Sequence, residues 1–286
     1  MAHGITGIDH TLVGVEDLEA ARRNWTRLGF TLSPRGRHIG WGTGNYCVMF
    51  PDDYIELLGI VETGQPVNGL DRMLAASGEG GLGLAFAGAS AEATAQSLER
   101  KGIGARPVED LARQLELPEG TVLPRFRLLR PEAGALPGLS AFLCQHTTPE
   151  LLRRPEWLRH DNRAAGLASV TVISSDPAAL ERSYERFFGP AAVTRTDDIL
   201  ALRVGRHQIV FASEDDIEAM HPGLMTEAAE PGVREGRMVL MSLLSEDLEA
   251  TADLLAQRQV EFEERPHALL VPADQANGVA LEFLSA

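Results

Sequence analysis

One order of elements, strand–helix–strand–strand–strand, recurs four times along the 286 residues, and only folds assembled from such units accommodate it. In the first unit, residues 7–15 predict a short strand, and residues 16–30 carry apolar side chains at helical spacing. Asp17 is placed to cap the start of this helix, and Gly29 to end it. The other strands of the unit are expected near residues 30–33, 44–50 and 54–60.

The other three units begin with strands at residues 81–90, 166–176 and 236–247, each followed by a helix. Their remaining strands are expected near residues 105–107, 121–129 and 140–146, then 192–195, 199–204 and 207–212, then 260–264, 268–272 and 279–284. Two such units placed edge to edge make an eight-stranded cup that holds one small ligand. The sequence therefore predicts an α+β fold in which four βαβββ modules form two cup-shaped, eight-stranded mixed sheets.

A polar, Arg-rich segment at residues 147–166 separates the second unit from the third and indicates a boundary. Residues 61–80 and 214–235 follow neither period, and they are expected to form loops or lids near a cavity. We expect a first domain with modules one and two and the site at 1–150, a connector at 151–166, and a second domain with modules three and four, without metal, at 167–286.

Composition and charge narrow the range of partners. Asp and Glu (41) outnumber Lys and Arg (26), and the formal net charge of −15 repels phosphate backbones and anionic lipid. No apolar run reaches the roughly 20 residues needed to span a bilayer. Cys47 and Cys144 are the only cysteines, as is usual for a reduced cytoplasmic protein. We expect a cytoplasmic protein with a small-molecule substrate and without nucleic-acid or membrane partners, and we allow for a homodimer.

Two polar residues occupy positions that should face the inside of a cup. His10 shares a strand face with Ile8 and Leu12, and Glu56 lies in the apolar run YIELLGI. A buried carboxylate is costly unless it binds a metal, a cation or a hydrogen-bond donor. An imidazole and a carboxylate suit a divalent ion, whereas the alternatives are a hydrogen-bonded core histidine and a salt bridge from Glu56 to an arginine.

Four more residues are candidates for contact with a ligand. His38 precedes the Gly-rich stretch that contains Asn45, and this region predicts either a substrate contact or a well-bonded hairpin. Arg125 and Arg127 alternate with apolar residues and share one face. They could clamp a carboxylate if that face points inward, and they are surface charge if it points outward.

The order of these motifs resembles the vicinal oxygen chelate superfamily. His10, then VEDL (15–18), LGF (28–30) and YIEL (54–57) are similar to its first module. RGRHIGWGTGNYCV (35–48) and QHTTPELLRRPEW (145–157) resemble its glyoxalase-like domain subgroup. The resemblance implies that His10 and Glu56 are metal ligands.

The later modules depart from the family pattern. Gly83 and Phe142 stand where module two should offer ligands, and His146, four residues farther along the strand, is the candidate replacement. In the C-terminal half, Ser169 or Val170 and Leu240 occupy the first-strand positions, and only Glu282 matches the carboxylate.

The resemblance implies a metal-dependent enzyme of lyase, isomerase or ring-cleaving dioxygenase type, acting on a small oxygen-rich molecule. Its cofactor would be a divalent ion (Zn, Fe, Mn, Ni or Mg) on His10, Glu56 and His146, with His38 or Glu56 moving the proton and Asn45, Arg125 and Arg127 contacting substrate. The alternative is a metal-free protein of the same fold that binds or sequesters a small molecule.

Overall fold

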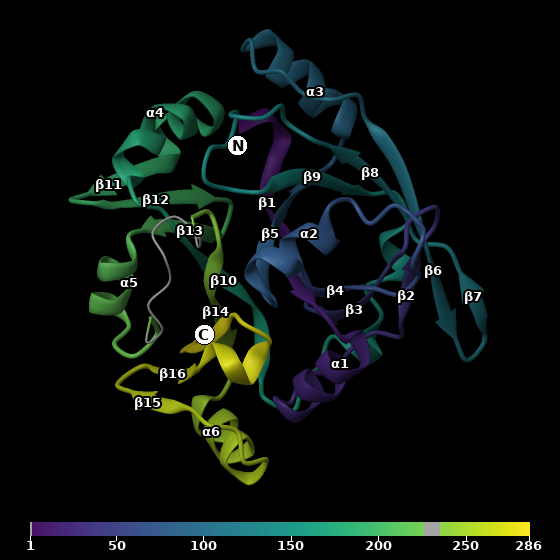
Figure 1. Ribbon diagram of the computed structural model, residues 1–286, viewed down its shortest axis with the longest axis vertical. Coiled ribbons are helices and arrows are strands. Elements are labelled where there is room, and N and C mark those ends of the chain that lie inside the picture. Colours follow the sequence, from purple (N-terminus) through teal and green to yellow (C-terminus); the bar gives the residue numbers. More distant parts are fainter. Residues whose placement is uncertain (1, 226–234) are drawn as a thin grey trace.

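The computed structural model describes residues 2–225 and 235–286, and it confirms the four βαβββ modules (Figure 1). Module one contains β1 (Ile5–Val15), α1 (Leu18–Arg27), β2 (Gly36–His38), β3 (Thr43–Met49) and β4 (Tyr54–Ile60). Module two contains β5 (Gly80–Gly88), α3 (Ala91–Arg100), β6 (Glu109–Leu117), β7 (Gly120–Val122), β8 (Arg125–Leu129) and β9 (Ala141–His146). Module three contains β10 (Ala164–Ile173), α4 (Pro177–Phe188), β11 (Val193–Thr196), β12 (Ile199–Val204) and β13 (His207–Ala212). Module four contains β14 (Met238–Ser245), α6 (Leu248–Gln257), β15 (Glu263–Arg265), β16 (Ala268–Val271) and β17 (Ala280–Ser285).

Each module helix begins directly after a capping Ser or Asp that lies two or three residues past the end of the first strand. The Asp17 carboxylate accepts hydrogen bonds from the backbone N–H groups of Glu19 and Ala20. The side chains of Ser90, Asp176 and Asp247 cap the other three helices in the same manner. These caps satisfy backbone donors that the first helical turn leaves unpaired, so they fix where the chain turns from strand to helix.

The strands of modules one and two close on themselves. Following the pairings around the sheet gives β1–β4–β3–β2–β6–β8–β9–β5 and then β1 again. The short antiparallel pair of β2 and β6 completes the ring, with His38 directly opposite Arg113. A closed ring of eight strands leaves an interior wide enough for side chains or one small ligand.

The strands of modules three and four form an open sheet in the order β11–β12–β13–β10–β14–β17–β16–β15. Module one therefore pairs with module two, and module three with module four. Among the described residues, β11 and β15 do not pair with one another. Instead the helix α5 (Glu214–Met220) packs Ile217 against Ile173 and Ala212.

Corresponding bulges interrupt the two central strand pairs. In β1, Ile8 faces Phe86 and His10 faces Ala85, which leaves Asp9 as the extra residue. In β10, Leu167 and Ser169 face partners on β14 and leave Ala168 as the extra residue. The register thus assigns Ser169, and not Val170, to the position of His10.

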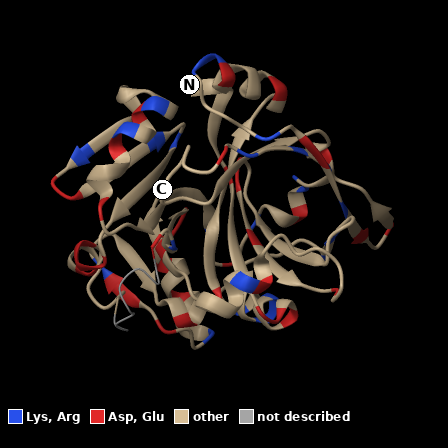
Figure 2. Cartoon of the chain, turned by 45° about the horizontal axis from the view of Figure 1, so that its top comes forward, with Lys and Arg blue, Asp and Glu red and all other residues tan. Residues whose placement is uncertain are grey.

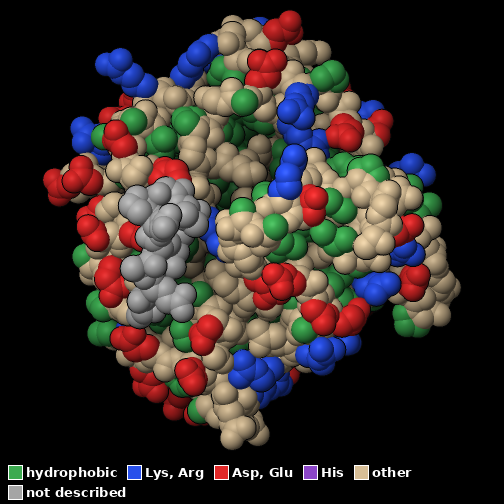
Figure 3. Space-filling view, in the orientation of Figure 1, with side chains coloured by type: hydrophobic (Ala, Val, Ile, Leu, Met, Phe, Trp, Pro, Cys, Tyr) green, Lys and Arg blue, Asp and Glu red, His purple; other side chains and the backbone are tan. Residues whose placement is uncertain are grey.

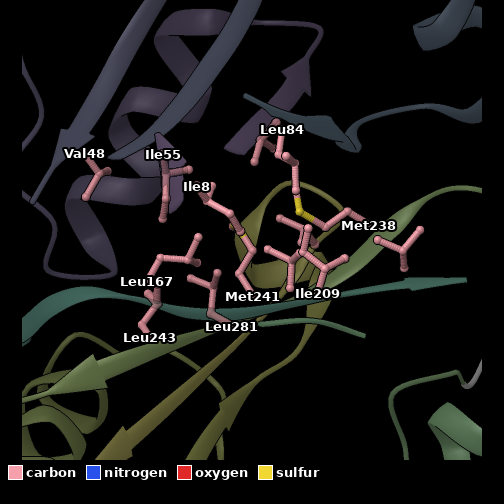
Figure 4. Packing of buried hydrophobic residues seen from close by; sticks show 14 of the residues in the cluster. Ile8, Val48, Ile55, Leu84, Leu167, Ile209, Met238, Met241, Leu243 and Leu281 are labelled. Carbon is pink, nitrogen blue, oxygen red and sulfur yellow. The ribbon is translucent and has the colours of Figure 1, made fainter. Parts of the chain in front are cut away.

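The largest apolar cluster lies between the two sheets (Figure 4). Ile8, Ile55 and Leu84 approach it from the closed sheet, and Leu167 and Met241 from the open one. Because one core serves both sheets, each sheet covers apolar surface that the other would otherwise expose to water. The division into domains at 1–150 and 167–286 stays a prediction.

Several segments differ from the sequence-based expectation. The second strand of module one lies at β2 and not at 30–33, because Phe30 is buried among Trp25, Phe283 and His160. Residues 105–107 contribute only an isolated bridge at Ala105, and the strand follows at 109–117.

Proline and local helix formation explain the other differences. The strand expected at 121–129 is interrupted at Pro124, which lacks an N–H for pairing. Short 3-10 turns at Pro149–Leu151 and Pro155–Trp157 fill the connector. A helix forms in each of the two irregular stretches, α2 (Leu70–Ser77) in 61–80 and α5 in 214–235, and residues 226–234 of the second stretch lie outside the described residues.

The surface mixes both signs of charge. Acidic and basic residues are distributed over both halves of the chain (Figure 2). On the face shown in Figure 3, a hollow lined with hydrophobic side chains has Lys and Arg side chains along one rim. No helix in the described ranges has the length and apolar character needed to cross a membrane.

Candidate functional site

A cavity of about 410 Å³ lies inside the closed sheet. Its walls are largely apolar, with Leu12, Leu128 and Phe142 among the lining side chains. Polar and charged side chains also line the cavity, among them His10, His38, Asn45, Glu56 and Arg113, with Arg106, Arg130 and Glu132 as further charged groups. A mostly apolar pocket with a few converging polar groups is the usual form of a small-molecule site.

His10 and Glu56 meet inside this cavity, as the sequence predicts. The imidazole Nε2 of His10 lies 3.4 Å from Oε2 of Glu56, and both residues are buried. The parallel pairing of β1 with β4 sets Leu12 opposite Glu56, so His10 lies two residues away on the same face. The His10 ring also stacks on Tyr54, with 4.4 Å between ring centroids, which fixes its plane.

The bulge in β1 places Asp9 on the same side of the strand as His10. Nδ1 of His10 lies 2.7 Å from Oδ2 of Asp9, and Asp9 is fully buried. Burial opposes ionisation of Asp9, but His146 and His10 outweigh it and hold the pKa of its carboxyl well below the ordinary value. An ionised carboxylate only accepts hydrogen bonds, so His10 donates through Nδ1 and leaves Nε2 facing Glu56.

His146 occupies the other side of Asp9. Its Nε2 lies 2.8 Å from Oδ2 of Asp9, and it is not among the residues that line the cavity. The structure therefore does not bring His146 to Glu56. It supports Asp9, which in turn supports His10.

His38 approaches Glu56 from β2. Its Nδ1 lies 2.9 Å from the Thr43 hydroxyl, and its Nε2 lies 3.7 Å from Oε1 of Glu56. Burial lowers the pKa of His38, although the Glu56 charge opposes this. A buried imidazole with a lowered pKa is neutral near pH 7, so it can accept a proton or bind a metal.

Asn45 holds the carboxylate of Glu56. Its amide Nδ2 donates to Oε1 of Glu56 at 2.6 Å, so it binds a site residue besides facing the cavity. Gly36 provides the room, because a Cβ there would lie 2.2 Å from Oδ1 of Asn45. Burial opposes ionisation of Glu56, but His10, His38 and other donors outweigh it and lower the pKa of the carboxyl.

Arg125 and Arg127 lie outside the cavity lining. Arg125 is exposed, and Arg127 forms ion pairs with Glu92 and Asp110 at the surface. The face that they share points outward, because inward positions of β8 are taken by Phe126 and Leu128. The proposed site therefore includes neither arginine.

Arg113 is a buried cavity residue that was not among the sequence-based candidates. It is 2 % exposed and lines the cavity from β6. The signal was present, because Leu111, Leu115 and Leu117 share its strand parity and are shielded from solvent. A single arginine among apolar residues of the same strand parity indicates a polar residue that faces the cavity, as Glu56 in YIELLGI does.

The module-two positions offer no ligand, for a steric reason in one case. Gly83 has a φ of +148°, and a Cβ there would lie 2.1 Å from the carbonyl oxygen of Ser140. No side chain fits at that position without backbone movement. Phe142 contributes a ring edge against His10, with 5.7 Å between centroids.

The equivalent position in the open sheet carries the carboxylate of Glu282, but the first strand there has no histidine in the position of His10. The Ser242 hydroxyl donates to Glu282 at 2.7 Å, and Nδ1 of His221 lies 3.7 Å from the other oxygen. Ser169 occupies the first-strand position there. His221 comes from the end of α5 and not from a strand of the sheet.

The donor set around Glu56 suits a divalent metal ion. Two imidazoles approach different oxygens of one carboxylate, which is the ligand set of many mononuclear metal enzymes. Asp9 holds the outer nitrogen of His10, the arrangement that orients metal-bound histidines.

A second group of donors is less suitable. Within residues 2–225 and 235–286, the one set of three ligating residues whose donor atoms all lie within 4.8 Å of each other is Asp9, Cys144 and His146. Burial raises the pKa of the Cys144 thiol, and metal binding requires the thiolate. Oδ2 of Asp9 is also already bonded to both histidines.

Comparison with known proteins adds family and fold. A model of the glyoxalase-like domain matches residues 8–188. The chain resembles a hypothetical protein from Staphylococcus aureus, with a TM-score of 0.66, 11% identity, and coverage of 98% of this chain and 99% of that one. It also resembles a triple mutant of 4-hydroxymandelate synthase from Streptomyces coelicolor, with a TM-score of 0.57, 12% identity, and coverage of 100% and 93%. Such low identities indicate a shared fold alone. No curated protein matches the sequence significantly.

Proposed function

Because this chain belongs to the glyoxalase-like domain family, we propose that it is a divalent-metal-dependent enzyme acting on a small, oxygen-rich organic molecule. The reaction class would be that of a lyase, an isomerase or a ring-cleaving dioxygenase. One observation carries the proposal: His10 Nε2 and Glu56 Oε2 lie 3.4 Å apart in a cavity, while Asp9 holds the other nitrogen of His10.

In this proposal His10 and Glu56 hold the ion, and His38 lies within reach as a third donor or a base. A bound divalent ion would supply Lewis acidity toward two neighbouring oxygens of the substrate. Asp9 keeps the imidazole of His10 in one tautomer and one orientation. Asn45 keeps the carboxylate of Glu56 turned toward the histidines.

His38 is the residue that we propose moves the proton. Its Nε2 faces the cavity, and Thr43 fixes Nδ1 on the other side of the ring. Because burial lowers the pKa of His38, the ring is neutral and ready to accept a proton at Nε2 near neutral pH. Apolar walls at Leu12, Leu128 and Phe142 limit water around that proton.

Metal analysis of the purified protein tests this proposal. The protein is stripped with a chelator and reconstituted separately with Zn²⁺, Fe²⁺, Mn²⁺, Ni²⁺ and Mg²⁺, and bound metal is measured after gel filtration. We expect one tightly bound ion per chain, lost in His10→Ala and in Glu56→Ala and kept in Glu282→Ala. Absence of stoichiometric metal in the wild-type protein would contradict the proposal.

The second candidate is a metal-free protein that binds or sequesters a small molecule. Gly83 and Phe142 favour it, because the second module contributes no ligand where the family resemblance expects one. The metal analysis separates the two candidates. A metal-free binding protein would retain no metal after any reconstitution and would still bind a small molecule in the cavity. We further propose a cytoplasmic location and a purely structural role for residues 167–286.

A further inference from the structure

Arg113 is buried and forms no ion pair in the part of the chain that the structure describes, although the charge of Glu56 in the same cavity acts on it. Arg113 lines the cavity, and its Nη1 donates to the thiol sulfur of Cys47 at 3.1 Å. Burial raises the pKa of the Cys47 thiol, so the sulfur is neutral and does not balance the charge. Nε and Nη2 have no hydrogen-bond partner among the described residues.

The two unpartnered nitrogens lie on one edge of the guanidinium. Nε–H and Nη2–H point in nearly parallel directions, and this edge is the one that binds two oxygens of a carboxylate side by side. The remaining nitrogen, Nη1, is the one that faces Cys47. The two donors without a partner therefore share one edge of the guanidinium, and both are shielded from solvent.

The surroundings hold this edge in place. The guanidinium carbon lies 5.7 Å from the ring centroid of Phe126, and β6 pairs Arg113 with His38 across the seam that closes the sheet. A buried cation with two unsatisfied donors is costly to a fold that gains nothing from it. A ligand that supplies two oxygens and one negative charge removes that cost.

We propose that the ligand of this cavity is a small carboxylic acid with an apolar remainder, and that Arg113 binds its carboxylate through Nε and Nη2. This inference rests on the proposed function in that it names the substrate class of the same cavity. One two-donor edge suits a carboxylate better than a phosphate, whose three terminal oxygens and higher charge call for more donors. The apolar walls at Leu111, Leu128 and Phe142 suit a hydrocarbon or aromatic remainder.

Binding of matched acids and amides to metal-free protein tests the inference. Phenylacetate, phenylacetamide and phenyl phosphate are titrated by ligand-observed NMR into chelator-treated wild type, Arg113→Met and Arg113→Lys, with acetate as a competitor that fits any carboxylate site. The matched control is Arg127→Met, which removes an arginine whose partners are at the surface. Thermal unfolding of each variant shows whether it is folded.

We expect phenylacetate to bind the wild type about 10- to 100-fold more tightly than phenylacetamide, the range of a charge-assisted pair. Acetate should displace it, and the preference should vanish in Arg113→Met, fall in Arg113→Lys and persist in Arg127→Met. Unfolding of Arg113→Met should occur at or above the wild-type temperature, whereas a merely structural arginine would lower it. Equal binding of acid and amide, an unchanged preference in Arg113→Met, tighter binding of phenyl phosphate, or no saturable phenylacetate binding would each overturn the inference. Because no metal is present, these results are independent of the metal analysis.

Discussion

The two eight-stranded sheets have the same modules and different interiors. In the N-terminal sheet, β2 and β6 pair and close a ring around a cavity with two imidazoles, a carboxylate and a guanidinium. In the C-terminal sheet, the corresponding edges β11 and β15 do not pair within the described residues, and buried apolar side chains form a small cluster on β14, β16 and β17. These are Leu240, Leu270 and Ala280, with Leu224 beside them.

In this fold, the strand pair that closes the sheet also carries two of the polar residues that line the cavity. The closing pair is only three residues long, and its last step sets His38 opposite Arg113. Both side chains then face the same enclosed space as Glu56. The open sheet keeps Glu282 but has no such seam, and a helix covers it instead.

The largest contrast should appear in the two helices that lie beside the sheets. Ile217 of α5 is fully buried, so Ile217→Ala should lower the free energy of unfolding by about 2–5 kcal/mol. Met73 of α2 lines the cavity and is 40% exposed, so Met73→Ala should change stability by less than about 0.5 kcal/mol. Urea unfolding of both variants measures this, and equal losses would mean that α2 is as much a part of the core as α5.

The next contrast concerns the two carboxylates. Glu56→Gln should weaken divalent metal binding by at least about 100-fold, because it removes a charged ligand that three polar side chains surround. Glu282→Gln should leave the affinity unchanged, since Ser169 stands in the position of His10 and leaves His221 as the one imidazole within 4 Å of Glu282 among the described residues. Competition with a chromogenic chelator gives both affinities. Weaker metal binding by Glu282→Gln would indicate that the metal binds in the C-terminal sheet, which would contradict the proposal.

The connector provides a pH-dependent contrast. His160 is buried, accepts from the Thr31 N–H through Nδ1, and burial lowers its pKa to about 4. The unfolded chain binds this proton near pH 6.5 and the folded one does not, so stability from His160 is full above pH 6.5 and lost as pH falls toward 4. Between pH 6.5 and 5 the loss should be about 2 kcal/mol.

His160→Gln should therefore flatten the pH dependence of the free energy of unfolding over that interval. The exposed His267, changed to Gln, is the control and should keep the wild-type slope. Because the two sheets share a core, a single unfolding transition should report the whole effect. Two transitions, with only one shifted, would show that the halves unfold separately.

The smallest effect is expected at Arg127. Its partners Glu92 and Asp110 are exposed, so Arg127→Ala should lower the free energy of unfolding by less than about 1 kcal/mol. Phenylacetate binding should not change. A clear loss of phenylacetate binding in Arg127→Ala would indicate that Arg127 contacts the ligand, and it would weaken the assignment of this role to Arg113.

The features that could be predicted from the sequence are those determined by residues close together in the chain. The helix cap at Asp17 and the strand around Glu56 depend on neighbours in the chain, and these predictions were correct. The meeting of His10 and Glu56 also followed, because two parallel neighbouring strands keep a fixed register.

The rest depended on features without a local signature. Strict alternation would turn Asp9 away from His10, and only the bulge brings both to one side. The position of His146 beside Asp9, and the outward face of Arg127, depend on how β8 and β9 join the ring. The apolar parity of β6 was a local signal for an inward Arg113, but its place opposite His38 required knowing that β6 closes onto β2.

Both central strands carry the same one-residue insertion, but Asp9 and His10 fill it in one and Ala168 and Ser169 in the other. The kink is therefore a property of the scaffold, available to whichever two amino acids follow Ile8 or Leu167. A protein of this kind can lose or gain an oriented acid–imidazole pair by exchanging two adjacent side chains, with the backbone left as it is. Because the bulge is present in both halves, substitutions at residues 168 and 169 could create a second acid–imidazole pair while Asp9 and His10 are retained.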